Sequence, residues 1–385
     1  MTPPALPGKI PNGMTENSIS AIAADSKIFM PVALPPPVHG QSTVNLRVLG
    51  QLTKRLGRVD SIRPCDISPG LARGLGYHGR RLVAVLRSCG SILRGARRGD
   101  VAYFVLESAL GRIYNLLLIL CARARGMRIV LHHHTSAHIL QFSPVFKCLG
   151  WLAGEQATHV TLSGAMQRAL NERYGTEFRS LVCHNASLIP PGDLRVRVFP
   201  RTSTLTIGLL SNLSVEKGVG TALTLIERLV RQGVPARLLL AGPIASAEVR
   251  ATIRSAAARL GDAVECLGPV SGNSKHDFFE RLDLFIFPTR YRFEAQPLVV
   301  IEAMSFGLPC LVTRQGFTAE IVGRPGDAFD DAEAFMAGAM ARIGEWRGDP
   351  ERYRRDSAWS IQRYRMLAKS SADDLESLLD EICGR

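Results

Sequence analysis

The chain alternates apolar, strand-like segments with amphipathic, helix-like ones, and it does so in two separate series. Residues 26–34 and 100–107 have the composition of strands in the first series, and residues 236–243 and 283–290 have it in the second. Strands that alternate with helices form parallel sheets. The pattern stops at "PPGDLRVRVFPRTST" (190–204) and then begins again. We therefore predict an α/β chain made of two doubly wound domains.

A length of 385 residues suits two domains with separate cores. We predict a disordered tail over residues 1–25, which are rich in Pro, Gly and polar residues and do not read as a secretory signal. The first domain is expected over 26–195 and the second over 205–355. In doubly wound sheets, ligands bind at the carboxyl ends of the strands near the switch point. A cleft between two such domains would gather loops from both.

The excess of positive over negative charge lies wholly in the first half of the chain. Residues 1–200 hold 24 Lys and Arg against 10 Asp and Glu, whereas residues 201–385 hold 23 against 24. The densest part, residues 79–99, interleaves arginines with apolar residues, as a basic amphipathic helix does. Two interpretations stay open: contact with an anionic membrane or acidic acceptor, and a solvated helix whose arginine stems cover apolar surface.

Composition also excludes several classes of protein. No run is long and apolar enough to span a bilayer. The eight cysteines are scattered without a C-x-x-C pair, which disfavours a disulfide framework or zinc site and favours the reducing cytoplasm. The basic residues lack the interleaved aromatics of a groove for single-stranded nucleic acid, so we expect no nucleic-acid partner.

Two glutamates interrupt an otherwise apolar stretch, "RYRFEAQPLVVIEAMSFGLPCL" (290–311). Glu294 lies on a predicted loop, and Glu302 lies inside a helix that starts at Pro297 and ends at Gly307. The free N–H groups at the start of a helix after a strand bind anions. The carboxylates would instead accept hydrogen bonds from hydroxyl groups. A nucleotide-diphospho-sugar supplies the diphosphate and the hydroxyls together.

This stretch resembles the E-x7-E signature of the family 4 retaining glycosyltransferases, which have the GT-B fold of two Rossmann-like domains facing a cleft. The matching positions are Glu294, Pro297, Leu298, Glu302, Ala303, Met304, Gly307 and Pro309. The resemblance extends from about residue 26 to the end of the chain. It implies that Glu294 contacts the transferred sugar and Glu302 the ribose, with Gln296, Pro297 and Leu298 also in the donor site. It further implies that residues 356–385 form C-terminal helices that pack back towards the first domain.

A second stretch, "GLLSNLSVEKGV" (208–219), is similar to the glycine- and lysine-containing loop of the same family. The resemblance implies that Lys217 binds the diphosphate, where a positive charge stabilises the leaving group. The family's arginine position is held here by Asn212, which we still place in donor binding. Arg290 or Arg292 could supply the missing charge.

Two loops of the first domain complete the predicted site. "PPPVHGQS" (35–42) resembles the family's glycine loop, so Gly40 is expected to approach the donor. "VLHHHTSAH" (130–138) resembles a strand end with a histidine that contacts the donor sugar. His134 is the closest match, and His132 shares its face because side chains alternate along a strand. The same alternation argues against a metal held by three adjacent histidines.

The predicted activity is transfer of a sugar from a UDP- or GDP-sugar to a saccharide or lipid-linked acceptor, with retention of anomeric configuration. We name Glu294, His134 and Lys217 as catalytic and expect no essential metal or other cofactor. Exopolysaccharide or lipopolysaccharide assembly at the inner face of the cytoplasmic membrane would suit the basic first domain. Two alternatives stay open: a nucleotide-sugar epimerase of the same fold, and a glycosyltransferase-like binding protein with weak or no catalysis.

Overall fold

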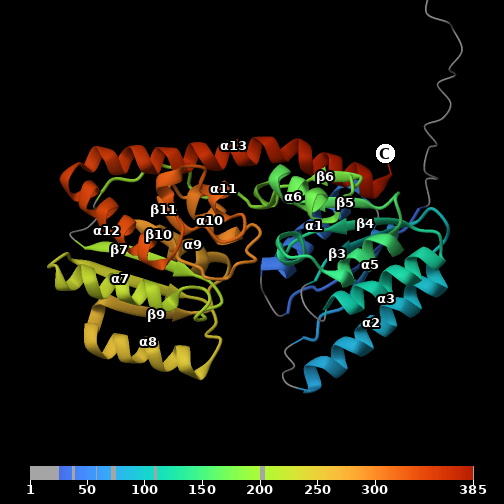
Figure 1. The fold of residues 1–385 in the computed structure, drawn as a ribbon, viewed down its shortest axis with the longest axis horizontal. Helices are drawn as coiled ribbons and strands as arrows, with labels where there is room; N and C mark the ends of the chain where they lie inside the picture. Colours follow the sequence, from blue (N-terminus) through green and yellow to red (C-terminus); the bar gives the residue numbers. More distant parts are fainter. Residues whose placement is uncertain are drawn as a thin grey trace, which may run out of the picture.

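The computed structural model describes residues 26–36, 40–57, 59–70, 75–107, 111–199 and 204–384. The predicted tail over residues 1–25 lies outside these ranges, and so does part of the loop before Gly40. Two α/β lobes lie side by side, joined by the segment around residues 190–199 and bridged by one long helix (Figure 1). The prediction of two doubly wound domains is confirmed.

The N-terminal domain is built on a six-stranded parallel sheet in the order β2-β1-β3-β4-β5-β6. The strands are β1 (Ile28–Val32), β2 (Ile62–Asp66), β3 (Val101–Val105), β4 (Arg128–His132), β5 (Thr158–Thr161) and β6 (Ser180–Val182). The helices are α1 (Gly40–Leu56), α2 (Leu75–Gly95), α3 (Gly111–Ala124), α4 (Ala137–Leu140), α5 (Pro144–Ala153) and α6 (Gly164–Tyr174). Strand β2 does not read as a strand in the sequence because it contains Pro64, which is tolerated at a sheet edge.

The C-terminal domain has a second six-stranded parallel sheet, in the order β12-β11-β10-β7-β8-β9. The strands are β7 (Leu205–Leu210), β8 (Ala236–Ala241), β9 (Val264–Gly268), β10 (Leu284–Phe287), β11 (Cys310–Thr313) and β12 (Ala328–Phe329). The helices are α7 (Val219–Arg231), α8 (Ala247–Leu260), α9 (Gly272–Glu280), α10 (Leu298–Ser305), α11 (Thr318–Val322) and α12 (Ala332–Gly348). Strands β7 and β10 are buried along their whole length, as expected for a sheet covered on both faces.

The topology of the second sheet fixes where a ligand binds. The chain runs outward from β7 through β8 to β9, and then crosses to the other side of β7 to form β10. Strands β7 and β10 are therefore neighbours from which the connections leave in opposite directions, and their carboxyl ends form the switch point at which sheets of this kind bind ligands. The loops that follow these two strands carry Lys217 and Glu294.

The long helix α13 (Pro350–Cys383) connects the C-terminal domain to the far end of the first domain. Asp349 caps it by accepting a hydrogen bond from the Glu351 N–H. At its other end, Glu381 accepts hydrogen bonds from Arg128 (3.1 Å) and Thr158 (2.8 Å) of the N-terminal sheet. Figure 1 shows α13 spanning both lobes. The predicted return to the first domain is confirmed, by one continuous helix that starts at Pro350 and not by several from residue 356.

Candidate active site

Lys217 and Glu294 form an ion pair at the carboxyl ends of β7 and β10. The Nζ of Lys217 donates to Oε1 of Glu294, and the Thr289 hydroxyl donates to the same oxygen at 3.0 Å. The Glu294 residue is 7% exposed, so its carboxylate is nearly withdrawn from water. The Lys217 ammonium also lies 5.0 Å from the centre of the Tyr291 ring. A buried carboxylate requires such partners. The two residues that the sequence assigns to sugar and diphosphate are thus brought together.

Two glycines allow the loops to approach so closely. Gly218 has a φ of 80°, and a Cβ there would overlap the carbonyl oxygen of Pro288 at the end of β10. Gly316 has a φ of 56°, and a Cβ there would overlap the carbonyl oxygen of Glu294. Residues with a side chain rarely adopt this left-handed conformation. Glycine at these two positions therefore allows the backbone next to Lys217 to approach Pro288, and the backbone at residue 316 to approach Glu294.

Helix α10 brings Glu302 to the same switch point. Pro297 occupies the N-cap position with φ −64°, and the helix begins at Leu298. Glu302 is only 6% exposed, and its Oε1 accepts a hydrogen bond of 2.6 Å from Lys275 of α9. Arg47 of α1, in the other domain, lies 3.9 Å from the same oxygen. The sequence does not predict these two cations, because neither has a spacing that ties it to Glu302.

The N-terminal domain faces the switch point with α1 and the end of β4. A Cβ on Gly40, the first residue of α1, would lie 3.9 Å from a methyl carbon of Leu298. The Ser136 hydroxyl, just after β4, donates to the carbonyl oxygen of Glu294 at 3.2 Å. Both contacts bring these two parts of the N-terminal domain next to the loop and helix that carry Glu294 and Glu302, while the predicted contact of Gly40 with the donor itself stays a prediction.

His132 and His134 lie on the same side of β4, as the alternation of side chains predicts, with ring centres 4.0 Å apart. His132 is fully buried, and its Nδ1 pairs with the Tyr103 hydroxyl at 2.6 Å. His134 is half-buried, and burial lowers its pKa to about 3. Burial and the neighbouring His134 also lower the pKa of His132 well below its usual value. Both rings are therefore neutral near pH 7 and can act as hydrogen-bond donors or acceptors, not as cations.

His133 points the other way, into a buried cluster with His138 and His159. Its Nδ1 lies 2.7 Å from Nε2 of His138, and its Nε2 lies 3.1 Å from Nδ1 of His159. Burial lowers the pKa of His138 to about 3 and that of His159 to about 4. Within the ranges that the structure describes, no group of three or more His, Cys, Asp or Glu residues is placed to hold a metal ion. This cluster belongs to the domain core.

Gln296 has a different environment from the one implied by its place in the signature. Its Oε1 accepts a hydrogen bond of 2.9 Å from the Asn185 N–H, and its Nε2 donates to the Leu162 carbonyl at 2.7 Å. The Asn185 amide in turn donates to the Gln296 carbonyl at 3.2 Å. The side chain is 8% exposed and is committed to the N-terminal domain. In this structure Gln296 joins the two domains.

Asn212 is exposed on the loop after β7. The loop is fixed by its backbone, since Ser211 N–H donates to Ala241 O and Leu213 N–H to Pro243 O. Of the two arginines suggested as substitutes, Arg290 is exposed, and Arg292 is exposed with its guanidinium 5.1 Å from the centre of the Phe293 ring. The structure thus leaves an uncharged side chain at the expected arginine position.

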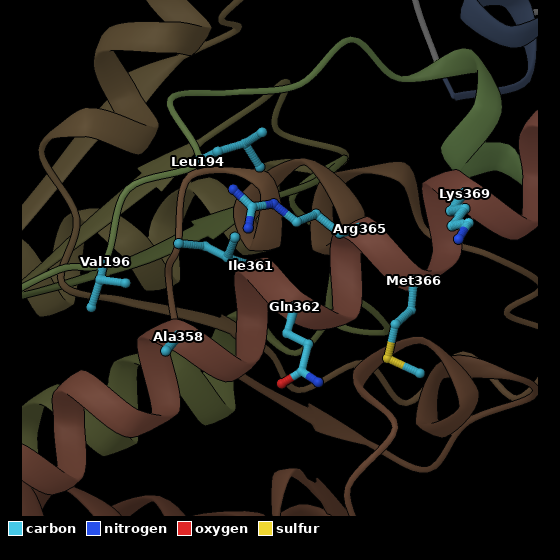
Figure 2. A pocket seen from close by; sticks show the side chains of 8 residues that line it. All are labelled: Leu194, Val196, Ala358, Ile361, Gln362, Arg365, Met366 and Lys369. Atoms are coloured by element: carbon cyan, nitrogen blue, oxygen red, sulfur yellow. The ribbon is translucent and has the colours of Figure 1, made fainter.

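A pocket of about 390 Å³ lies elsewhere, between α13 and the segment that connects the domains. Figure 2 shows that Leu194 and Val196 come from the connecting segment and that the other lining residues lie on α13. Arg365 and Lys369 are the charged residues of this lining. None of the residues assigned to donor binding lines it, so it is separate from the site at the sheet ends.

Comparison with protein families identifies the C-terminal domain. Residues 204–343 match a family model described as "Glycosyl transferases group 1". The C-terminal domain is therefore similar to that family over most of its length. The matched residues contain Lys217, Glu294, Glu302 and the switch point between β7 and β10. A search of curated protein sequences gave no match.

Solved structures share the fold of this glycosyltransferase over nearly its full length. Sucrose-phosphate synthase from Thermosynechococcus elongatus has a TM-score of 0.68 at 14% identity and covers 93% of this chain and 99% of its own. Anabaena Alr3699/HepE, solved with UDP and glucose, has a TM-score of 0.64 at 16% identity, and the match covers 91% of this chain and 99% of that protein. A UDP-forming trehalose-phosphate synthase from Burkholderia vietnamiensis has a TM-score of 0.64 at 13% identity and covers 92% and 99%.

These findings confirm the GT-B fold and place the chain among the glycosyltransferase enzymes. Because the sequence identities are low, the similarity to the solved structures shows the fold and not the substrate. Across the described part of the glycosyltransferase, no helix is long and apolar enough to cross a membrane.

Proposed function

We propose that the chain transfers a sugar from a nucleotide-diphospho-sugar to a saccharide or lipid-linked acceptor, with retention of configuration. The observation that carries the proposal is the Lys217–Glu294 ion pair at the switch point between β7 and β10. A doubly wound sheet binds its ligand there. The pair offers a cation for the diphosphate and a carboxylate for the sugar hydroxyls within one contact. The solved complex of Alr3699/HepE with UDP-glucose supports a UDP-sugar as the donor class.

The residues divide the donor between them. Glu294 accepts hydrogen bonds from hydroxyls of the transferred sugar, and Glu302 accepts them from the ribose. Lys217 and the free N–H groups at the start of α10 bind the diphosphate. In the reaction, the bond from the anomeric carbon to the diphosphate oxygen breaks, and the acceptor hydroxyl bonds to that carbon from the same face while its proton passes to the departing diphosphate oxygen. Lys217 stabilises the charge that develops on the leaving oxygen.

The proposal needs no essential metal, because protein groups supply the positive charge. Lys217 lies on the loop after β7, and the N-terminus of α10 lies at the same switch point. His132 and His134, neutral in their buried setting, bind the sugar by hydrogen bonds. The exposed Asn212 favours the alternative of a binding protein with weak catalysis, since the diphosphate would then be less well neutralised.

We also propose that the enzyme acts at the inner face of an anionic membrane, in exopolysaccharide or lipopolysaccharide assembly. An exposed apolar face on the N-terminal domain supports this. It runs over α2, α3, α5 and the loop before α5, and its members are between 36% and 81% exposed: Leu82, Val83, Leu86, Leu93, Ile113, Leu117, Leu120, Phe142, Val145 and Trp151. Helices α2 and α3 pack together, and so do α3 and α5 (Figure 1). Exposed arginines interleave with this face, including Arg80, Arg87 and Arg94.

A face of this kind fits an anionic lipid surface better than it fits water. Scattered apolar residues are normal on a protein surface, but ten on adjacent helices are not. Apolar side chains would enter the boundary of the acyl chains while arginines bind the headgroups. The basic excess of residues 1–200 acts in the same direction.

A panel of labelled UDP- and GDP-sugars with membrane extract tests the proposed activity, scored as transfer to lipid and as donor hydrolysis. We expect one donor to give transfer and Glu294→Ala to abolish it. Release of free nucleotide with an altered sugar and no acceptor would instead indicate the epimerase. Nucleotide binding without turnover would indicate the binding protein.

A further inference from the structure

The donor site must neutralise a diphosphate without the arginine that the resemblance would place at position 212. A diphosphate carries several negative charges, and Asn212 carries none. The two ion pairs at the site cancel internally, since Lys217 balances Glu294 and Lys275 balances Glu302. The dipoles of the helix N-termini add only partial charges. A further cation is needed if the site is to attract a diphosphate.

Arg47 offers a further cation beside Glu302, and it comes from the other domain. It lies on α1 two helical turns after Gly40, so the two residues share one face of that helix. Gly40 faces Leu298 at the start of α10, and Arg47 faces Glu302 one turn into α10. Two points on one face of α1 therefore approach α10, and the second of them places the guanidinium beside Glu302.

The guanidinium of Arg47 has hydrogen-bonding capacity to spare. Its Nη2 is 3.9 Å from Oε1 of Glu302, beyond hydrogen-bond distance, and that oxygen already accepts from Lys275 at 2.6 Å. Its Nη1 is shielded from water and has no hydrogen-bond partner among the described residues. Leaving a buried N–H unpaired is costly, and for a charged group more so. A ligand oxygen in the cleft would remove that cost.

We propose that Arg47 donates hydrogen bonds to the donor diphosphate and supplies the positive charge that Asn212 lacks. The inference rests on the proposed function, because it takes a nucleotide-diphospho-sugar as the ligand. Arginine suits the role, since its planar fork binds phosphate oxygens in pairs. The charge then comes from the N-terminal domain, across the cleft, so diphosphate binding also holds the two domains together.

Binding of UDP, GDP, uridine and guanosine to the full chain, measured by calorimetry, tests this. The nucleoside reports the ribose contact with Glu302, and the diphosphate adds the phosphate contact. Arg47→Gln should weaken binding of the preferred nucleoside diphosphate roughly 10- to 100-fold, while the affinity for the corresponding nucleoside should change less than about twofold. Arg47→Lys should fall between, because it keeps the charge and loses the fork. Lys54→Ala, an exposed cation on the same helix, should match the wild type.

A rescue experiment makes the test sharper. Asn212→Arg in the Arg47→Gln background should restore a large part of the lost diphosphate affinity, since it returns a charge to the position that the resemblance indicates. Equal losses for nucleoside and nucleoside diphosphate would overturn the proposal, because Arg47 would then act only by positioning Glu302. Unchanged diphosphate binding would overturn it too. If the wild type binds neither UDP nor GDP, the proposed function itself is wrong and this inference fails with it.

Discussion

The two domains have the same architecture and handle polar groups in opposite ways. Each has a six-stranded parallel sheet with helices on both faces. The C-terminal domain pairs its buried charges, as at Lys217–Glu294 and at Asp356, which accepts hydrogen bonds from Arg324 and Trp346. The N-terminal domain buries uncharged imidazoles, such as His133 and its two neighbours, and carries its excess of positive charge on the outside. One fold thus supports a charged ligand site in one domain and, in the other, a core rich in neutral imidazoles beneath a basic surface, with the Arg81–Glu107 ion pair as a largely buried exception.

The difference follows from what each domain is proposed to bind. A diphosphate and a sugar need fixed charges and acceptors at the sheet ends, and these must be paired when the ligand is absent. An acceptor at a lipid surface needs a basic, apolar exterior. The buried histidines serve neither purpose directly, and they make the N-terminal domain sensitive to acid.

The largest expected effect is a loss of stability of the N-terminal domain at mildly acidic pH. Burial lowers the pKa of six histidines there, to about 3 for His134 and His138 and to about 4 for His159 and His184. Unfolding restores the ordinary value of about 6.5, so the unfolded chain takes up protons first as the pH falls. Stability is full above pH 6.5 and declines below it, by about 1 kcal/mol for each buried histidine between pH 7 and 5.5.

Hydrogen exchange measured at pH 7 and at pH 5.5 distinguishes the responses of the two domains to acid. Peptides from β3, β4 and β5 should lose protection at pH 5.5 while those from β7 and β10 keep it, since the C-terminal domain has only the exposed His276. His276→Asn, the matched control, should leave both profiles unchanged. Simultaneous loss in both domains would show that they unfold as one unit.

Paired charges give the C-terminal domain the opposite response, and Asp356 is its clearest case. Burial alone would raise the pKa of Asp356, but its hydrogen bond from Trp346 and the charges of Arg324 and Arg342 lower it. Asp356 therefore stays ionised at pH 5.5, and its contribution is lost only as the pH falls through its lowered pKa. Asp356→Asn should remove about 1.5–3 kcal/mol of the free energy of unfolding, because it takes away a buried charged acceptor while Asp327 still pairs with Arg324 and Arg342.

Chemical denaturation at pH 7 measures this loss. Asp373→Asn, an exposed carboxylate on the same helix, serves as the control and should change the free energy of unfolding by less than about 0.5 kcal/mol. A small effect for Asp356→Asn would mean that the arginine cluster around it is solvated in solution.

Much of the fold and part of the candidate site could be predicted from the sequence. Continuous apolar runs and restarted alternation are local signals, and they predicted the two doubly wound domains correctly, whereas the crossing helix was implied only by the family resemblance. Glu294 and Glu302 stand out because acids are unusual in a buried stretch. The placement of His132 and His134 on one face follows from strand periodicity alone.

The rest depends on contacts between distant parts of the chain. Arg47 and Lys275 approach Glu302 although they are 255 and 27 residues away in the sequence, and no sequence pattern predicts either contact. Gln296 sits in the signature, yet its side chain binds Asn185 and Leu162, which only tertiary structure brings near. Strand β2 contains a proline, so its pattern argues against a strand unless its edge position is known.

Removing the cation of the donor pair should act on chemistry and also lower stability. Lys217→Ala should lower kcat about 10²- to 10³-fold, as for loss of a group that stabilises developing negative charge. Thr289 would still hold the Glu294 carboxylate by its hydrogen bond of 3.0 Å, but the buried carboxylate loses its cation, so the melting temperature should fall. Transfer assays with the preferred donor measure the effect on kcat at a temperature where circular dichroism shows the variant to be folded. Activity within twofold of the wild type would remove Lys217 from the proposed mechanism.

The smallest expected effect concerns the exterior of the N-terminal domain, where the contrast with the C-terminal domain is most visible. Leu86→Glu with Leu120→Glu places two negative charges on the exposed apolar face, at side chains that are each 52% exposed. Binding to phosphatidylglycerol vesicles should weaken at least about 10-fold, from lost apolar burial and from repulsion by the headgroups. Val230→Glu on α7, a 38% exposed residue of the C-terminal domain, should not change it. Because these leucines are exposed and far from the donor loops, hydrolysis of a soluble donor should be unaffected. Equal vesicle binding by all variants would assign the face to a protein partner or a second copy of the chain.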